Sequence, residues 1–164
     1  MALSALLRLL VRGNLTKSLD LTTPVDALNK TFEQSLISGT GSGQADQQFH
    51  DERTLGDGAN ESLDLAGSLG DAFGTTLTFA KIKALVIVNK DTTRTLSVGG
   101  AASNAWSAWL GDATDIIKVP PGGVLAWFNP DGVAVTAGTG DLLKIANAAG
   151  GSTIYDIIVI GTSA

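Results

Sequence analysis

The stretch LTFAKIKALVIVN, residues 77–89, decides the fold expected for this chain. Its second half, residues 84–88, is apolar at every position and β-branched at three of five. A strand with one solvated face alternates between apolar and polar residues, so we expect this strand to be covered on both sides. In the first half, an apolar face that begins at Leu77 becomes charged at Lys81. This change predicts a bulge near Lys81 or a strand that leaves the core there.

A second long apolar run, IYDIIVI at residues 154–160, is expected to be the other central strand of one β core. Between roughly residues 61 and 160, strand-like segments recur about every ten residues with Gly, Pro, Asp and Asn turns between them. This spacing is typical of an antiparallel sandwich and not of βαβ units. We therefore predict an all-β fold, an antiparallel two-sheet β-sandwich. About eight strands favour a jelly-roll-like topology, although periodicity alone leaves an immunoglobulin-like topology open.

Two hairpins are expected within this core. Residues 95–98 are predicted to pair back onto the central strand across a turn at residues 90–93. The sequence NPDG at residues 129–132 has Pro, Asp and Gly in the order that suits a type I turn, so it is predicted to join two paired strands.

The N-terminal third is more polar, and we divide the chain into residues 1–55, an N-terminal arm with edge strands, and residues 56–164, the β-sandwich core. Leucines at helical spacing allow a short helix over residues 1–13, although an amphipathic arm or first strand is preferred. Residues 15–21 are expected to form a strand, and residues 44–55 an edge strand or an extended arm.

Charge and composition exclude several classes of function. Cysteine is absent, so disulfide and thiolate chemistry are excluded. A net charge of −5 argues against a general nucleic-acid surface, with one exception in the basic start formed by Arg8, Arg12 and Lys17. No apolar run reaches the roughly 18 residues that span a bilayer, and Arg8 interrupts the run that resembles a signal peptide. We expect no membrane partner.

The chain offers little for catalysis. A single histidine, His50, cannot build a metal site of the cupin kind, which needs several histidine ligands. Its neighbours in the run HDER point to alternate faces of a strand, which favours a solvated face over a catalytic cluster. Asp112 and Asp115 are read as turn residues; a hydrolase would need them to converge in a cleft. We therefore expect no catalytic residue, no cofactor and no metal, and a protein that is not an enzyme.

Trp106 and Trp109 lie in a loop at residues 99–111 that has few other large apolar side chains. Large aromatic side chains there can anchor a partner or a sugar ring, or can fold back to cap one end of the sandwich. Together with Arg8, Arg12 and Lys17, these two tryptophans are the candidate partner-interface residues.

Four segments of the last two thirds resemble small structural proteins of tailed-bacteriophage virions, especially jelly-roll capsid decoration (cement) proteins. They are KALVIVN at 83–89, VPPGG at 119–123, DLLKIAN at 141–147 and IYDIIVIG at 154–161. The resemblance implies a homo-oligomeric protein of the virion, assembled in the host cytoplasm, that binds the major capsid protein or other virion proteins at the capsid surface and stabilises the shell. No site residue is carried over, because the family has no catalytic motif.

The alternative function is a carbohydrate- or receptor-binding β-sandwich module of a phage tail, fibre or vertex. In that case Trp106, Trp109 and Trp127 are the expected stacking platforms. A partner role for the basic start, toward an acidic capsid patch or packaged DNA, also stays open at this point.

Overall fold

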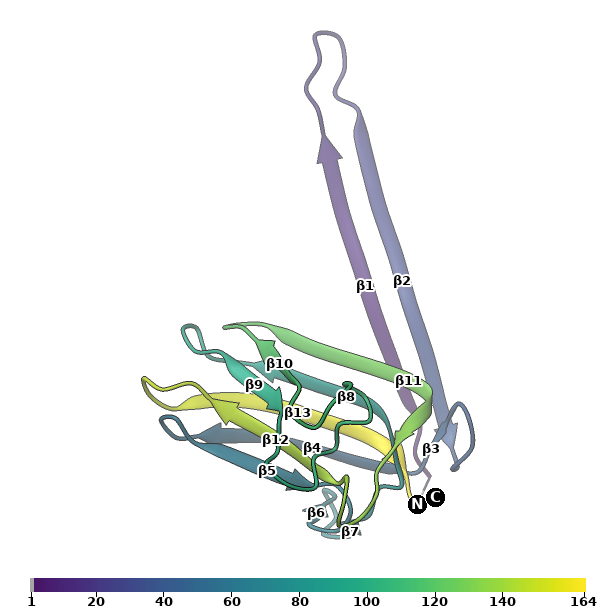
Figure 1. Ribbon diagram of the computed structural model, residues 1–164. Helices are drawn as coiled ribbons and strands as arrows, with labels where there is room; N and C mark the ends of the chain where they lie inside the picture. The colour runs from purple at the N-terminus through teal and green to yellow at the C-terminus, as the bar shows by residue number, and fades with distance from the viewer. Residues whose placement is uncertain (1) are drawn as a thin grey trace.

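The computed structural model describes residues 2–164, which form strands and connecting loops without a helix (Figure 1). The all-β, antiparallel prediction is therefore confirmed. No described segment is a helix that could cross a membrane. The strands, in chain order, are β1 (Ala5–Thr16), β2 (Val25–Ser38), β3 (Gln44–Ala45), β4 (Gln47–Leu55), β5 (Asn60–Asp64), β6 (Leu69–Gly70), β7 (Thr76–Leu77), β8 (Lys81–Asn89), β9 (Leu96–Gly99), β10 (Ile116–Val119), β11 (Val124–Ala134), β12 (Leu142–Asn147) and β13 (Thr153–Thr162).

Two four-stranded antiparallel sheets pack face to face in a sandwich-like arrangement. Sheet I has the order β11-β8-β13-β4, and sheet II has the order β10-β9-β12-β5. The core between them is fully buried, with Ile87 and Ile157 from sheet I and Val98 and Ile145 from sheet II. As predicted, the two apolar runs, β8 and β13, are the inner strands of sheet I, where they pair with each other.

The turn after β8 carries the chain from sheet I to sheet II, so the hairpin predicted for residues 95–98 is wrong. Strand β9 pairs with β10 and β12 instead of β8. The carboxylate of Asp91 accepts hydrogen bonds from the backbone N–H groups of Thr93 at 2.6 Å and Arg94 at 2.8 Å. Asn89 Nδ2 donates to the Arg94 carbonyl oxygen at 2.7 Å. These side-chain bonds satisfy the turn's backbone locally, so the strands on either side are free to belong to different sheets.

The NPDG segment is also not a hairpin turn. Residues 129–132 interrupt the single strand β11, whose two halves pair with β8 in the same direction on either side. Asn129 Oδ1 accepts bonds from the N–H groups of Asp131 and Gly132, and the loop is tied to β8 because Lys83 Nζ donates to the Pro130 carbonyl oxygen at 2.9 Å. Opposite this loop, the β8–β13 register shifts at Lys83, which is the bulge predicted near Lys81.

Strands β1 and β2 form a long hairpin that projects away from the two sheets (Figure 1). The helix allowed for residues 1–13 and the strand expected over residues 15–21 are therefore wrong: β1 ends at Thr16 and residues 17–24 form the turn. Apolar residues at every second position of β1 have the period of a strand, which the extra leucines Leu6 and Leu10 conceal in the sequence.

The base of the hairpin is fixed to sheet I. Leu36 and Ala45 are buried with Ala84 and Ile160, and Leu7 packs against this cluster. The short strand β3 pairs in parallel with the end of β2. Strand β4, from the segment assigned to arm and edge strands, pairs with β13 as the edge strand of sheet I.

Gly161 allows β13 to pass close to β8 at the bulge. A Cβ atom at this position would collide with the backbone carbonyl oxygen of Lys81 and with the ring of Phe79. We expect Gly161→Ala to lower the free energy of unfolding by about 1–3 kcal/mol, because backbone atoms must shift to make room.

Gly67→Ala is the matched control, because a Cβ atom there meets nothing within 4 Å and the residue is exposed in the loop between β5 and β6. Its free energy of unfolding should stay within about 0.5 kcal/mol of wild type in urea titrations. Equal effects of the two substitutions would show that the close approach at Gly161 does not constrain the fold.

Candidate interaction surface

The β1–β2 hairpin has two chemically different faces. Directly paired residues of an antiparallel ribbon point to the same side, so the register defines both faces. We name as the apolar face the side formed by Ala5, Leu7, Leu9, Val11, Gly13 and Leu15 of β1 and by Leu36, Gln34, Phe32, Lys30, Leu28 and Asp26 of β2. The polar face is the other side, formed by Leu6, Arg8, Leu10, Arg12, Asn14 and Thr16 of β1 and by Ser35, Glu33, Thr31, Asn29, Ala27 and Val25 of β2.

The chain itself covers only the lower end of the apolar face. Leu36 is buried and Leu7 is half-buried where the hairpin joins sheet I. Beyond that point Leu9 is 60% exposed, Phe32 62% and Leu15 73%. A two-stranded ribbon with this much exposed apolar surface has marginal stability in water. We name the part of the apolar face from Leu9 to Leu15 and from Leu28 to Phe32 the upper apolar face; no other part of the chain packs on it.

Sheet I has a second open apolar surface on the side away from the core. We name as the outer face the side chains that share this side, which are Ala84, Val86 and Val88 of β8, Val124, Ala126 and Phe128 of β11, and Ile154, Ile158 and Ile160 of β13. Polar residues of β4, including His50 and Glu52, border it. Glu52 and Asp156 both pair with Lys90 there, at 2.5 and 2.7 Å.

The prediction that residues 84–88 are covered on both sides is wrong for most of this strand in the single chain. Ala84 is buried beneath the hairpin base, but Val86 and Val88 are only half-buried, and Val124 beside them is 60% exposed. Within one chain, the outer side of β8 is covered only at its beginning, at Ala84.

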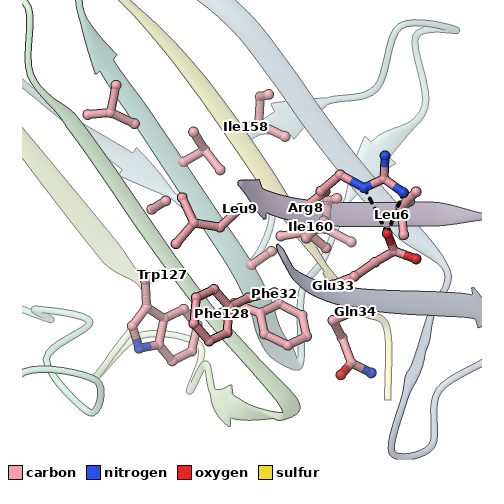
Figure 2. A pocket seen from close by; sticks show the side chains of 15 residues that line it. Leu6, Arg8, Leu9, Phe32, Glu33, Gln34, Trp127, Phe128, Ile158 and Ile160 are labelled. Carbon is pink, nitrogen blue, oxygen red and sulfur yellow. Dashed lines mark hydrogen bonds and ion pairs between the residues drawn. The ribbon is translucent and has the colours of Figure 1, made fainter. Parts of the chain in front are cut away.

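The apolar face and the outer face meet at an open wedge of about 690 Å³ (Figure 2). Leu9 and Phe32 line it from the hairpin, and Val86, Phe128 and Ile158 line it from sheet I. The lining is mostly apolar, and the charged residues Arg8 and Glu33 lie at its rim as an ion pair of 2.6 Å. The wedge is therefore an apolar groove with a charged rim.

The basic candidate residues are divided between two places. Arg8 and Arg12 lie four residues apart along β1 on the polar face, where Arg8 pairs with Glu33 and Arg12 is exposed. Lys17 follows β1 in the turn at the far end of the hairpin. The polar face therefore combines two guanidinium groups, while Lys17 is separate from them.

The tryptophan candidates lie against the core. Trp106 is buried, stacks on Trp109 with ring centroids 5.4 Å apart, and donates from Nε1 to the Ala134 carbonyl oxygen at 2.9 Å. Trp127 contacts both rings edge-on, at 6.3 and 6.0 Å. Trp109 and Trp127 are partly buried against the same core. Trp106 therefore presents no open ring face, and the three rings pack against one another.

Several acidic residues serve as hydrogen-bond acceptors in turns. Asp115 accepts from the Asp112 N–H at 2.8 Å, and Asp112 accepts from the Thr114 N–H at 3.0 Å. The bond from the Thr114 N–H is the main reason that the pKa of Asp112 is lowered, and bonds from other backbone N–H groups lower the pKa of Asp57 and of Asp91. Within residues 2–164, no group of three or more His, Asp or Glu side chains is placed to hold a metal ion.

One polar cluster closes the edge between β4 and β5, and sequence reasoning missed it. Arg53 pairs with Glu61 at 2.5 Å and with Asp51 at 2.8 Å, and the buried Tyr155 hydroxyl donates to Glu61 at 2.6 Å. Burial is the main reason that the pKa of Tyr155 is raised. The partners come from three strands, so no local motif signals the cluster. The acidic groups are engaged with Arg53, which makes this a structural contact.

No protein-family model, curated protein or solved structure matches this chain. The proposals below therefore depend on its own residues and geometry.

The Asp91 turn predicts a specific response to acid. Because the folded-state pKa of Asp91 is below its unfolded value of about 3.9, the stabilisation is complete above roughly pH 5 and is lost as the pH falls toward the folded value. Asp91→Asn should lower the melting temperature at pH 7, and the difference from wild type should shrink between pH 5 and pH 2.5. A difference that stays constant over this range would show that the carboxylate charge does not stabilise the turn.

Proposed function

We propose that this chain is a non-enzymatic virion structural protein, a capsid decoration (cement) protein that binds the major capsid protein and stabilises the shell. The observation that carries the proposal is the projecting hairpin with one apolar and one basic, polar face. A ribbon that is marginal in isolation gains its stability from a partner, so its working state is an assembled one. The hairpin is, in this proposal, an N-terminal assembly arm.

The strand order supports a jelly-roll relationship. If the eight strands of the two sheets are renumbered from 1 to 8 along the chain, sheet I has the order 6-3-8-1 and sheet II the order 5-4-7-2. Every connection crosses between sheets except the one from strand 4 to strand 5. Jelly rolls with two Greek keys occur in viral capsid domains and in lectins. The fold therefore fits a virion protein, but the hairpin is what favours an assembly function.

The polar face suits a contact with acidic protein surface. Arg12 is exposed there, and Arg8 lies on the same face four residues away along β1, paired with Glu33. A net charge of −5 disfavours a broad contact with nucleic acid, which needs many clustered cations. We therefore propose a protein partner for this face, and a place on the surface of the particle.

A carbohydrate-binding function has less support. Trp106 is buried, and Trp109 and Trp127 pack against it, so the tryptophan cluster would have to open before a sugar could stack on it.

Binding to capsid shells tests the proposed function. Shells assembled from the major capsid protein of the same genome should bind the wild-type chain saturably, and bound shells should melt at a higher temperature. Arg12→Glu should weaken binding about 3–10-fold at low salt, with the difference closing as salt is raised, because it reverses a charge at the proposed contact.

Lys118→Glu is the matched control, because Lys118 is exposed on β10 of sheet II, away from the hairpin. It makes the same change in net charge and should bind as wild type does. A wild-type chain that ignores the shells at about 100 μM, a concentration at which even weak specific contacts are occupied, would refute the proposal.

A further inference from the structure

We propose that the upper apolar face of the hairpin packs on the outer face of sheet I of a second copy of this chain. The inference shares with the proposed function only the idea that the hairpin is an assembly element, and it names the first partner of that element. The upper apolar face and the outer face of sheet I are both exposed. Because every copy of the chain carries both surfaces, each surface always has a potential partner at the same concentration.

The hairpin is poorly placed to cover its own sheet. Its pairing runs without interruption from Ala5–Leu36 to Thr16–Val25, so the ribbon has no irregularity at which to bend down. Its base is fixed at Leu36 within the small buried cluster. Strand β1, with 12 residues, spans roughly 40 Å, whereas β8, with 9, spans roughly 30 Å. The hairpin thus reaches beyond its own sheet, as Figure 1 shows.

The available area is sufficient for a specific contact. The exposed apolar side chains of the upper apolar face are Leu9, Val11, Leu15, Leu28 and Phe32, and those of the outer face include Val124, Ile154 and Ile158. Covering one set with the other would bury on the order of 1,000 Å², and a reciprocal exchange between two copies makes this contact twice. Stable interfaces bury about this much surface, while a monomer seldom leaves so large an apolar area open.

The polar residues of the two surfaces are also compatible. On the apolar face, β1 is apolar throughout, whereas β2 carries Lys30 and Asp26. On the outer face, β8 and β11 are apolar, whereas the side toward β4 carries Glu52, Asp156 and Lys90. If β1 of the hairpin lies over β8 and β11 of the second copy, β2 lies over the side toward β4. Lys30 of β2 then comes near the carboxylates of Glu52 and Asp156.

Each copy both offers a hairpin and accepts one. Such contacts close as a reciprocal pair or as a ring, and in both cases the wedge between the hairpin and sheet I is filled. The polar face, with Arg8 and Arg12, stays on the outside of the assembly, where it is free for the capsid contact proposed above.

Two neighbouring leucines give a matched test. Leu9 is on the apolar face and Leu10 on the polar face, and both are exposed, so Leu9→Asp and Leu10→Asp introduce the same charge without disturbing the core. Light scattering on the wild-type chain should give a multiple of 16.7 kDa. Leu9→Asp and Val124→Asp should shift the protein to 16.7 kDa, and Leu10→Asp should keep the oligomer. A wild-type chain that stays monomeric at about 100 μM overturns the inference, whatever else then binds the apolar face.

Cross-linking identifies the surfaces in contact. The chain has no cysteine, so single cysteines can be introduced without background. Phe32→Cys mixed and reassembled with Val86→Cys or with Ile158→Cys should give a disulfide-linked dimer, whereas Thr31→Cys, on the polar face, should not. A link that forms only within one chain carrying both cysteines means that the hairpin covers its own sheet. That result, or an oligomer without any such link, overturns the inference.

The two proposals fail in different ways. A chain that forms hairpin-linked oligomers but ignores capsid shells refutes only the proposed function. A monomer that binds shells refutes only the contact between copies.

Discussion

The rest of this structure depends on one constraint: apolar residues on one side of a two-stranded ribbon must be covered. Within a sheet of the sandwich, each strand is paired laterally and packed across the core, so its inward-facing apolar side chains are buried. Beyond its base, the β1–β2 hairpin has the pairing between its two strands but no layer packed on its apolar face, which continues to Leu15. The proposed contact between copies would cover this face, since a monomer seldom leaves so large an apolar area open.

The sandwich serves as the platform for this element. The two sheets bury a continuous core, and the cluster around Leu36 and Ala84 fixes the direction in which the hairpin leaves. The bulge at Lys83 and the loop at residues 129–132 lie beside this cluster and are joined by the Lys83–Pro130 hydrogen bond. Irregular pairing thus occurs where the sheet must support the hairpin, which agrees with the use of bulges to redirect strands.

Much of the core was predictable from the sequence, because period and turn residues report directly on strands that pack against each other. The runs now seen as β8 and β13 were placed correctly, as was the bulge near Lys81. The pairing partners of β9 and β11 could not be predicted in the same way. Asp91 and Asn129 bond to the backbone of their own turns, and such local bonds do not determine which strand the next segment pairs with. The hairpin was obscured because Leu6 and Leu10 add helical spacing to a strand pattern. The candidate surface was missed as a site, because its parts are far apart in the sequence and become adjacent only in the fold.

Hydrogen exchange as a function of protein concentration tests the central claim most directly. When the chain is concentrated, the backbone amides of β1 and β2 should be protected, because a covered ribbon keeps its hydrogen bonds closed. On dilution below the dissociation constant of the oligomer they should exchange rapidly, while the amides of β8 and β13 stay protected. Hairpin amides that exchange equally fast at every concentration, or that stay protected in a dilute monomer, would contradict the claim that another chain covers the apolar face.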